Sequence, residues 1–364
     1  MSAREDTIAV NGVFLDQEMT GVQRYAAELL EALCAMPGRR FRFAVMAPRR
    51  GAEGAPAPGD RLILDRSRLP NPLWIQWRLP KLCRREGAGL LWSPTNAGPL
   101  SVRRQVVTMF DAAVFAEPRW FSPSFRLYYR ALLPRLARRA ARVVTISEFS
   151  RGELSRHLGL PADRIDVVPC GVSQRFHPGA DSSEWCRRKP YCLVVSSRNP
   201  RKNLAAILRA WSLLDPSLSS GRRLLVAGPA ARIYAEEALG QVPPGVEFLG
   251  FVPEGSLPGL YAGAEAFVYP SLYEGFGLPP LEAMASGTPT LVSRAASLPE
   301  VCGEAALYSD PLDSAGMARA LEALLTDEAL RARLRDAGIQ RSHAFTWEEA
   351  AKRMLFVLDK TLAG

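Results

Sequence analysis

The sequence predicts an α/β protein of two domains, each a parallel sheet covered by helices. Its 364 residues are long for one domain and sufficient for two hydrophobic cores. Short apolar runs alternate with helix-like stretches along the whole chain, as parallel sheets require. An irregular, polar stretch at 173–190 separates two such series. We therefore expect domains at 1–172 and 191–344, a linker at 173–190, and a last helical segment at 345–364.

The elements of the first domain follow from apolar spacing. A strand is expected at 7–15, with a possible turn at Asn11 and Gly12. A helix is predicted over 22–33, because Val22, Tyr25, Ala26, Leu29, Leu30 and Leu33 recur at helical spacing. Further strand-like runs lie at 41–46, 90–93, 106–110, 142–146 and 165–172.

The second domain repeats this alternation. Its strand-like runs lie at 191–196, 223–228, 246–251, 264–269 and 289–293. The tail at 347–362 carries apolar residues spaced as on an amphipathic helix. No internal repeat of solenoid period is present, which excludes a repeat protein.

Composition indicates a soluble globular protein, with 48% hydrophobic and 23% charged residues. The six cysteines form no C-x-x-C pair and no cluster with metal-ligand spacing, as expected in a reducing compartment. The charged first residues fit no secretion signal, and no apolar run approaches the length of a membrane span. We expect a cytoplasmic protein.

The net charge of +9 is unevenly distributed. Residues 1–180 carry 27 Lys or Arg against 16 Asp or Glu, whereas residues 181–364 carry 19 against 21. This asymmetry predicts an anionic partner for the first domain: nucleic acid, an anionic membrane or an acidic lipid-linked acceptor. The alternative is a solvated basic surface with no specific partner.

The segment 271–287 carries the strongest functional signal. It holds Glu274 and Glu282, eight positions apart, around a Gly-x-Gly loop between an apolar strand and a helix that Pro279 and Pro280 would open. Free backbone N–H groups and the helix dipole favour phosphate there, and the two carboxylates can accept hydrogen bonds from hydroxyl groups. The pattern suits a nucleotide-sugar, although similar turns also serve tight packing alone.

This segment resembles the Glu-x7-Glu signature of retaining glycosyltransferases of family 4, which have the GT-B fold. The resemblance continues through 297–308 and 248–252. It implies two facing Rossmann-like domains with a central cleft, and a last helix that crosses back to the first domain. It also implies that Glu282 binds the ribose, that Glu274 binds the transferred sugar, and that Val252 lies beside the nucleobase. The diphosphate would lie near the amides of Gly275, Phe276, Gly277 and Leu278.

Basic residues in 196–203 are candidates for neutralising that diphosphate. Arg198 and Lys202 follow a strand and precede a helix, and Arg201 is an alternative to Arg198. Ordinary solvent-facing charges are the other interpretation. The chain contains no Asp-x-Asp motif. We therefore expect no metal and no cofactor, with a nucleotide diphosphate-sugar as donor substrate.

The first domain contributes two further candidates by resemblance. Gly21 matches the short glycine loop of the family, where the backbone approaches the donor, although a plain helix start is the other interpretation. The pair Phe110–Asp111 stands where the family often has His-Asp, and the three histidines lie elsewhere. Asp111 is therefore the catalytic candidate beside Glu274. A sugar that lacks the usual hydroxyl, or lost activity, would also fit Phe110.

Two stretches of the first domain suit a membrane surface. The run 69–85 mixes Trp74 and Trp77 with basic residues, and 124–142 carries six arginines, several at helical spacing. A solvated helix face is the commoner explanation for either stretch alone, but two of them in the basic domain favour peripheral membrane contact.

These observations predict a cytoplasmic, metal-independent, retaining hexosyltransferase, peripheral on the inner membrane. It would transfer a hexose to a lipid-linked oligosaccharide in surface polysaccharide synthesis, with no nucleic-acid partner. The resemblance alone implies that this hexose is mannose or a deoxyhexose from a GDP-sugar. The alternatives are a nucleotide-sugar 2-epimerase, which the scarcity of histidine disfavours, and a nucleotide-sugar-binding protein without transfer activity.

Overall fold

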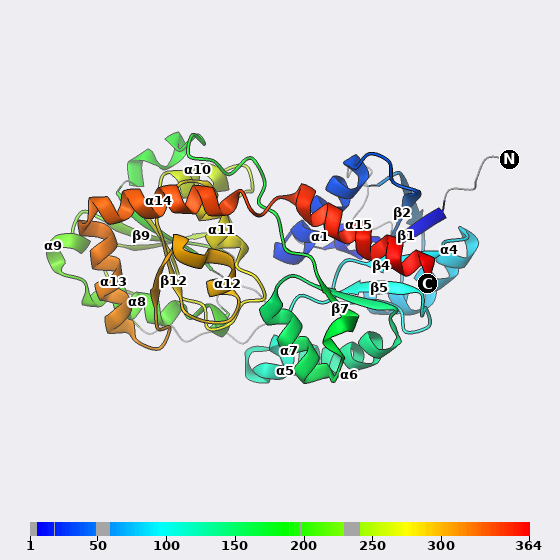
Figure 1. The fold of residues 1–364 in the computed structure, drawn as a ribbon. Coiled ribbons are helices and arrows are strands. Elements are labelled where there is room, and N and C mark those ends of the chain that lie inside the picture. Colours follow the sequence, from blue (N-terminus) through cyan, green and yellow to red (C-terminus); the bar gives the residue numbers. More distant parts are fainter. Residues whose placement is uncertain (1–5, 18, 49–58, 189, 197–198, 229–240) are drawn as a thin grey trace. The chain divides into compact units, whose positions relative to one another are not determined.

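The computed structural model describes residues 6–17, 19–48, 59–188, 190–196, 199–228 and 241–364 (Figure 1). The chain divides into two compact units. Unit 1 comprises Met1–Phe115, Leu127–Gly171 and Trp347–Gly364, and unit 2 comprises Ala116–Arg126 and Val172–Thr346. Each unit contains one parallel sheet, so the predicted α/β class is confirmed.

Unit 1 is built on a seven-stranded parallel sheet with the order β3-β2-β1-β4-β5-β6-β7. Its strands are β1 (Asp6–Asn11), β2 (Phe41–Pro48), β3 (Arg61–Asp65), β4 (Leu90–Ser93), β5 (Gln105–Thr108), β6 (Arg142–Thr145) and β7 (Ile165–Val167). The helices along this part of the chain are α1 (Gly21–Ala35), α3 (Asn71–Leu73), α4 (Leu79–Arg85), α5 (Ala113–Ala116), α6 (Pro123–Arg139), α7 (Glu148–Leu158) and α15 (Trp347–Ala363).

Several predicted boundaries in unit 1 are wrong. The first strand does not continue to residue 15 but ends at Asn11, where a turn was expected: the Asn11 side chain accepts a hydrogen bond from Val13 N, and a 3₁₀ helix follows over Gly12–Asp16. The edge strand β3 was not predicted. Strand β5 stops at Thr108, so Phe110 lies in the loop beyond it.

Unit 2 is built on a six-stranded parallel sheet with the order β10-β9-β8-β11-β12-β13. Its strands are β8 (Tyr191–Val195), β9 (Arg223–Ala227), β10 (Val246–Gly250), β11 (Ala266–Tyr269), β12 (Thr290–Ser293) and β13 (Leu307–Ser309). Its helices are α8 (Leu204–Leu213), α9 (Pro216–Ser219), α10 (Leu257–Ala262), α11 (Leu278–Ala285), α12 (Leu298–Cys302), α13 (Ser314–Thr326) and α14 (Glu328–Ser342). The last strand, β13, was not predicted.

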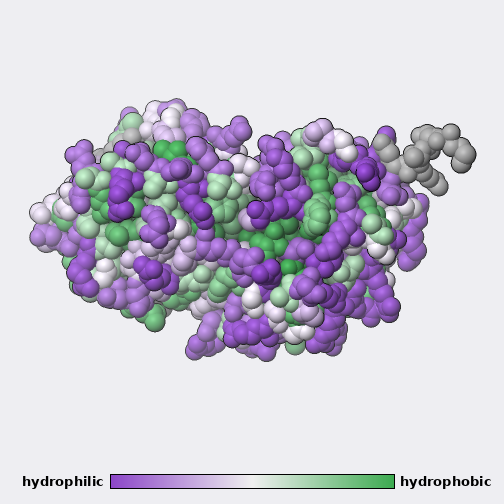
Figure 2. Space-filling model, in the orientation of Figure 1, coloured by the Kyte–Doolittle hydropathy of each residue, from purple (hydrophilic) through white to green (hydrophobic). Residues whose placement is uncertain are grey.

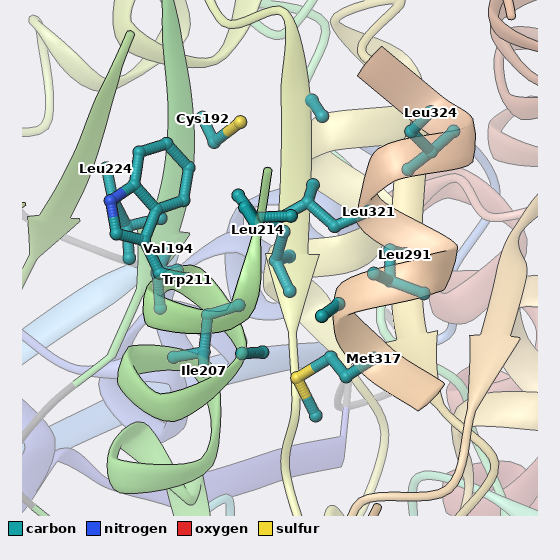
Figure 3. Packing of buried hydrophobic residues seen from close by; sticks show 14 of the residues in the cluster. Cys192, Val194, Ile207, Trp211, Leu214, Leu224, Leu291, Met317, Leu321 and Leu324 are labelled. Carbon is teal, nitrogen blue, oxygen red and sulfur yellow. The ribbon is translucent and has the colours of Figure 1, made fainter. Parts of the chain in front are cut away.

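Helices cover both faces of the unit 2 sheet. Trp211 of α8 packs with Val194 of β8 and Leu321 of α13 on one face, as Figure 3 shows. A second cluster around Phe267 and Met284 covers the other face. Because the inner strands β8, β9, β11 and β12 are largely buried on both sides, they read as apolar runs rather than as alternating patterns.

The predicted linker at 173–190 is wrong. Phe176 and Trp185 are buried in the core of unit 2, and Trp185 Nε1 donates a hydrogen bond to Ser256 O at 3.3 Å. A 3₁₀ helix occupies Ser183–Arg188. The two aromatic side chains therefore anchor this polar stretch as part of unit 2.

The last helix, α15, belongs to unit 1, so the prediction that the chain returns to the first domain is confirmed. It lies beside α1 (Figure 1), and the rings of Trp347 and Tyr25 are 6.0 Å apart. At its other end, Arg104 donates a hydrogen bond to Leu362 O at 2.7 Å. Helix α15 thus completes the core of unit 1.

Candidate functional site

The order of strands in unit 2 reverses between β8 and β11, which lie side by side. In open α/β sheets, ligands bind beyond the carboxyl ends of the strands at such a reversal. The loop after β8 leads to Lys202, and the loop after β11 leads to Glu274. The topology therefore brings two residues that are 72 positions apart to one end of the sheet.

The loop after β8 is fixed by two asparagines. The Asn199 side chain is fully buried and accepts a hydrogen bond from Arg201 N at 3.1 Å. Asn203 has a positive φ of 55° and donates from Nδ2 to Pro270 O and Pro311 O at 3.1 and 2.7 Å. Lys202 is held between these anchors. Arg198 lies outside the described residues, so its role stays a prediction.

Lys202 and Glu274 form a buried ion pair. Lys202 Nζ donates to Glu274 Oε1 at 2.7 Å, and the two side chains are only 14% and 8% exposed. The same Nζ donates to the hydroxyl of Tyr269 and lies 4.8 Å from the centroid of its ring. Tyr269 was not foreseen, because its role depends on a lysine on the neighbouring strand's loop.

The neighbouring charges and burial shift the pKa values of Glu274 and Tyr269 in opposite directions. Burial alone would raise the pKa of Glu274, but the positive charges of Lys202 and Arg201 outweigh it and lower that pKa. Burial and the nearby Glu274 carboxylate raise the pKa of Tyr269 well above its usual value of 10.0. At neutral pH the site therefore holds an ionised carboxylate and an un-ionised phenol.

The loop that carries Glu274 is tied to the start of α12. Ser297 Oγ lies within hydrogen-bond distance of both Glu274 O and Phe276 O, at 2.9 and 2.7 Å. Gly277, with φ of 113°, precedes α11, and a Cβ there would lie 2.7 Å from Leu298 Cδ2. The predicted strand, glycine loop and helix opened by prolines are thus confirmed.

Glu282 lies on α11 and is 3% exposed. Its Oε2 accepts a hydrogen bond from the fully buried Tyr261 Oη at 2.9 Å, so α10 fixes its direction. Val252 is buried just beyond β10, whereas the neighbouring Phe251 is 67% exposed. The nucleoside contacts expected of Glu282 and Val252 stay predictions.

The candidates of the first domain belong to unit 1. Gly21 opens α1, and nothing lies within 4 Å of a Cβ placed on it. Asp111 Oδ1 accepts a hydrogen bond from Ala113 N at 2.9 Å. Phe110 is 6% exposed, and its ring packs edge-on against Tyr25 with the centroids 5.1 Å apart. Phe110 is thus part of an aromatic core.

The two stretches predicted to meet a membrane are only partly exposed. Trp74 is fully buried and donates its Nε1 to Asp65 Oδ2 at 2.9 Å, so its assignment to an interface is wrong. Trp77, by contrast, is 58% exposed. Arg142 lies on β6 and pairs with Asp166 at 2.7 Å. Hydrophilic residues dominate the surface around α6, as Figure 2 shows, and its exposed arginines are Arg130, Arg135, Arg138 and Arg139.

The described residues include neither a group of metal ligands nor a helix that could span a membrane. Within these residues, no three His, Cys, Asp or Glu side chains lie grouped as a metal site would require. None of the described helices is long and apolar enough to cross a membrane.

Comparisons with known proteins find glycosyltransferase families along both units. Residues 19–176 match the family described as Glycosyltransferase Family 4, and residues 181–341 match Glycosyl transferases group 1. The chain is 31% identical over 310 residues to O-antigen chain mannosyltransferase B of Escherichia coli, covering 81% of this chain and 79% of that protein. It is 31% identical over 290 residues to the MMP alpha-(1->4)-mannosyltransferase of Mycolicibacterium hassiacum, covering 76% and 69%.

The fold is shared with a solved enzyme. The sucrose-phosphate synthase of Thermosynechococcus elongatus superimposes with a TM-score of 0.76 over 98% of this chain and 99% of that chain, at 21% identity. At that identity the likeness concerns the fold alone.

Proposed function

The chain belongs to glycosyltransferase family 4, and on this premise we propose that it is a retaining, metal-independent hexosyltransferase of surface polysaccharide synthesis. Its two parallel-sheet units and returning helix α15 are those of the GT-B fold. The donor would be a nucleotide diphosphate-sugar. The acceptor would be a lipid-linked oligosaccharide.

The buried Lys202–Glu274 pair is the observation that carries this proposal. It places a cation and a carboxylate beyond adjacent strands, next to the amino end of α11. A diphosphate would be neutralised by Lys202 and by the backbone amides of 275–278, and these groups stabilise the charge that develops as it departs. Glu274 would accept hydrogen bonds from hydroxyls of the sugar. Metal independence is proposed because the chain lacks Asp-x-Asp.

The remaining contacts are assigned by family. Glu282 would bind the ribose and Val252 would lie beside the base, with Arg198 as a further cation. From unit 1, Gly21 would let the backbone approach the donor, and Asp111 would contact the reacting sugar. The ring of Phe110 packs in the core of unit 1 and would supply no hydrogen bond to the sugar, as a deoxyhexose donor would allow.

The choice of donor and acceptor rests on the relatives. Both relatives described above are mannosyltransferases, one of which acts on the O-antigen chain by name. We therefore propose mannose, or a deoxyhexose, from a GDP-sugar as the transferred group. A lipid-linked acceptor would bring the enzyme to the inner membrane surface.

The proposed membrane contact centres on Trp77. It projects from the π-helical turn Trp74–Arg78, close in sequence to the exposed cations Lys81, Arg84 and Arg85. An exposed indole among basic residues is typical of peripheral binding to anionic lipid. The protein would then be cytoplasmic and peripheral.

Incubation with UDP-, GDP- and dTDP-sugars tests the activity. We expect nucleoside diphosphate to be released only when a lipid-linked acceptor is added. Interconversion of the sugar without acceptor would indicate a 2-epimerase. Binding without turnover would indicate a nucleotide-sugar-binding protein and would overturn the transferase.

Glu274→Ala tests the site. We expect transfer to fall by about 100-fold or more, because the sugar loses its carboxylate partner. Glu265→Ala is the matched control, since Glu265 lies in another ion pair of unit 2, 2.9 Å from Arg222 and just before the amino end of β11. Full transfer activity in Glu274→Ala would refute the assignment.

A further inference from the structure

Lys202 and Glu274 depend on each other for charge compensation. Each side chain is the other's ionic partner in a largely buried position, at 2.7 Å. Lys202 also donates to Tyr269, whose ring is 1% exposed. A ligand that takes over the hydrogen bond of Lys202 therefore leaves the buried carboxylate without the cation bonded to it, with the charge of Arg201 still acting on it.

We propose that this ion pair couples recognition of the diphosphate to recognition of the sugar, so that the site prefers the intact nucleotide-sugar over the nucleoside diphosphate. This inference rests on the proposed function. It explains why the affinity for the nucleotide-sugar substrate would exceed the affinity for the nucleoside diphosphate product.

The coupling follows from the rule that a buried charge must keep a partner. A diphosphate alone competes with Glu274 for Lys202. The free energy that the diphosphate gains from Lys202 is offset by the cost of leaving the buried Glu274 carboxylate without that hydrogen bond. When the sugar is attached, its hydroxyls donate to Glu274 while the phosphate oxygens take Lys202. Both buried charges then stay paired.

The same exchange favours product release. Once the sugar has left for the acceptor, Glu274 loses its hydroxyl partners and again competes for Lys202. The diphosphate is then bound more weakly than in the donor complex. Tyr269 would keep Nζ within the site while its ionic partner changes, because the hydroxyl and ring of Tyr269 contact Nζ independently of Glu274.

Calorimetric titration of the purified protein tests the coupling. GDP and GDP-mannose, UDP and UDP-glucose, and dTDP and dTDP-glucose are titrated without acceptor, and the pair that binds is used. For the wild type we expect the sugar nucleotide to bind about tenfold more tightly, as one charged hydrogen bond would give. Glu274→Gln should raise the affinity for the diphosphate by about tenfold and abolish the preference.

Lys202→Met provides a second, independent measurement. It should weaken binding of the sugar nucleotide by a larger factor than binding of the diphosphate, because the diphosphate alone gains little from a lysine that Glu274 retains. Glu265→Gln, which removes the side-chain charge from the Arg222 pair, is the control and should leave both affinities unchanged.

The outcomes separate the two claims. A wild type that binds none of the six nucleotides overturns the proposed function and this inference together. A wild type that binds and transfers, with a Glu274→Gln variant that binds the diphosphate no more tightly, overturns the coupling alone. If Glu274→Gln does not fold, equal loss of both affinities in Lys202→Met overturns it.

Discussion

Phe110 occupies a position where the family often has histidine, and its surroundings account for the phenyl ring. It packs against Tyr25, which in turn packs against Trp347 of α15. Tyr25 is fully buried and Phe110 is 6% exposed. An imidazole here would bring polar nitrogens into an aromatic cluster, so the position serves the core of unit 1.

Phe110→His should therefore destabilise unit 1 rather than restore a missing catalytic group. We expect a loss of about 1–3 kcal/mol, the penalty for burying an imperfectly paired polar group. Denaturant unfolding measures it. Phe110→Leu, which keeps the site apolar, is the control and should lose less. An unchanged midpoint together with faster transfer in Phe110→His would contradict this assignment.

Gly277 is a position where the backbone conformation requires glycine. Its φ of 113° disfavours any side chain, and a Cβ would lie 2.7 Å from Leu298 Cδ2. Gly277→Ala should lower stability by about 1–3 kcal/mol through strain and overlap, and reduce transfer because the loop carries Glu274. Gly152→Ala, on the exposed face of α7 with nothing within 4 Å, is the control and should be neutral or stabilising. Equal effects of the two changes on thermal unfolding would refute the argument.

At this scale the sequence predicts residue types better than partners. Glu274 and Lys202 were predicted from their local sequence context and from the resemblance to the family, and the structure pairs them. Tyr269 and Tyr261 were not, because a buried tyrosine in an apolar run looks like any core aromatic until its long-range partner is known. Trp74 was misassigned for the same reason, since its partner Asp65 comes from an unpredicted strand.

Asp65, at the end of β3, holds together the segment that runs from β3 through α3 to α4. Asp65 Oδ1 accepts from Arg78 at 2.7 Å, and Oδ2 accepts from Trp74 at 2.9 Å and Ser67 at 2.6 Å. The hydrogen bond from Arg78 holds the pKa of Asp65 well below its usual value of 3.8. This carboxylate connects the edge strand to the π-helical turn and leaves Trp77 facing outward.

Asp65→Asn should weaken this element in a pH-dependent way. A carboxyl with a lowered folded pKa stabilises the protein above its unfolded pKa, and that contribution fades as pH falls toward the folded pKa. We expect a loss of about 1–2 kcal/mol at neutral pH, discounted because Arg78 is 37% exposed, and a smaller difference from the wild type below about pH 4. Urea unfolding at several pH values measures this. Asp336→Asn, exposed on α14, is the control, and a pH-independent difference for Asp65→Asn would contradict the mechanism.

Trp77 is the part of this element expected to meet lipid. Trp77→Ser should reduce co-sedimentation with vesicles of phosphatidylglycerol and phosphatidylethanolamine by about tenfold, because one indole supplies much of the apolar anchoring. Leu312→Ser, in unit 2 and 82% exposed, is the matched control and should sediment like the wild type. Equal sedimentation of wild type and Trp77→Ser would place any membrane contact elsewhere.

For the whole molecule, the alternation of strands and helices was sufficient to predict two parallel sheets. Their edges were harder to predict: β3 and β13 are short strands next to polar loops, and a five-residue or three-residue run is a weak signal. The assignment of one segment of the first half of the chain to the second unit was also not predicted. Residues Ala116–Arg126 group with unit 2, where Trp120 packs against Tyr273 at 6.2 Å, although the chain on either side belongs to unit 1. Such a contact leaves no periodicity in the sequence.

Helix α15 should be indispensable to unit 1 and dispensable to unit 2. It buries Trp347, Met354, Val357 and Leu358 in unit 1. At about 1.5–3 kcal/mol for each large buried side chain, their loss rivals the whole stability of a domain, about 5–15 kcal/mol. A chain ending at Thr346 should therefore lose the calorimetric transition of unit 1 and keep that of unit 2. Phe356→Ala, on the exposed side of the helix, is the control and should keep both transitions. If the truncated chain kept both, unit 1 would have a sufficient core without α15, and the return of the chain would serve something other than stability.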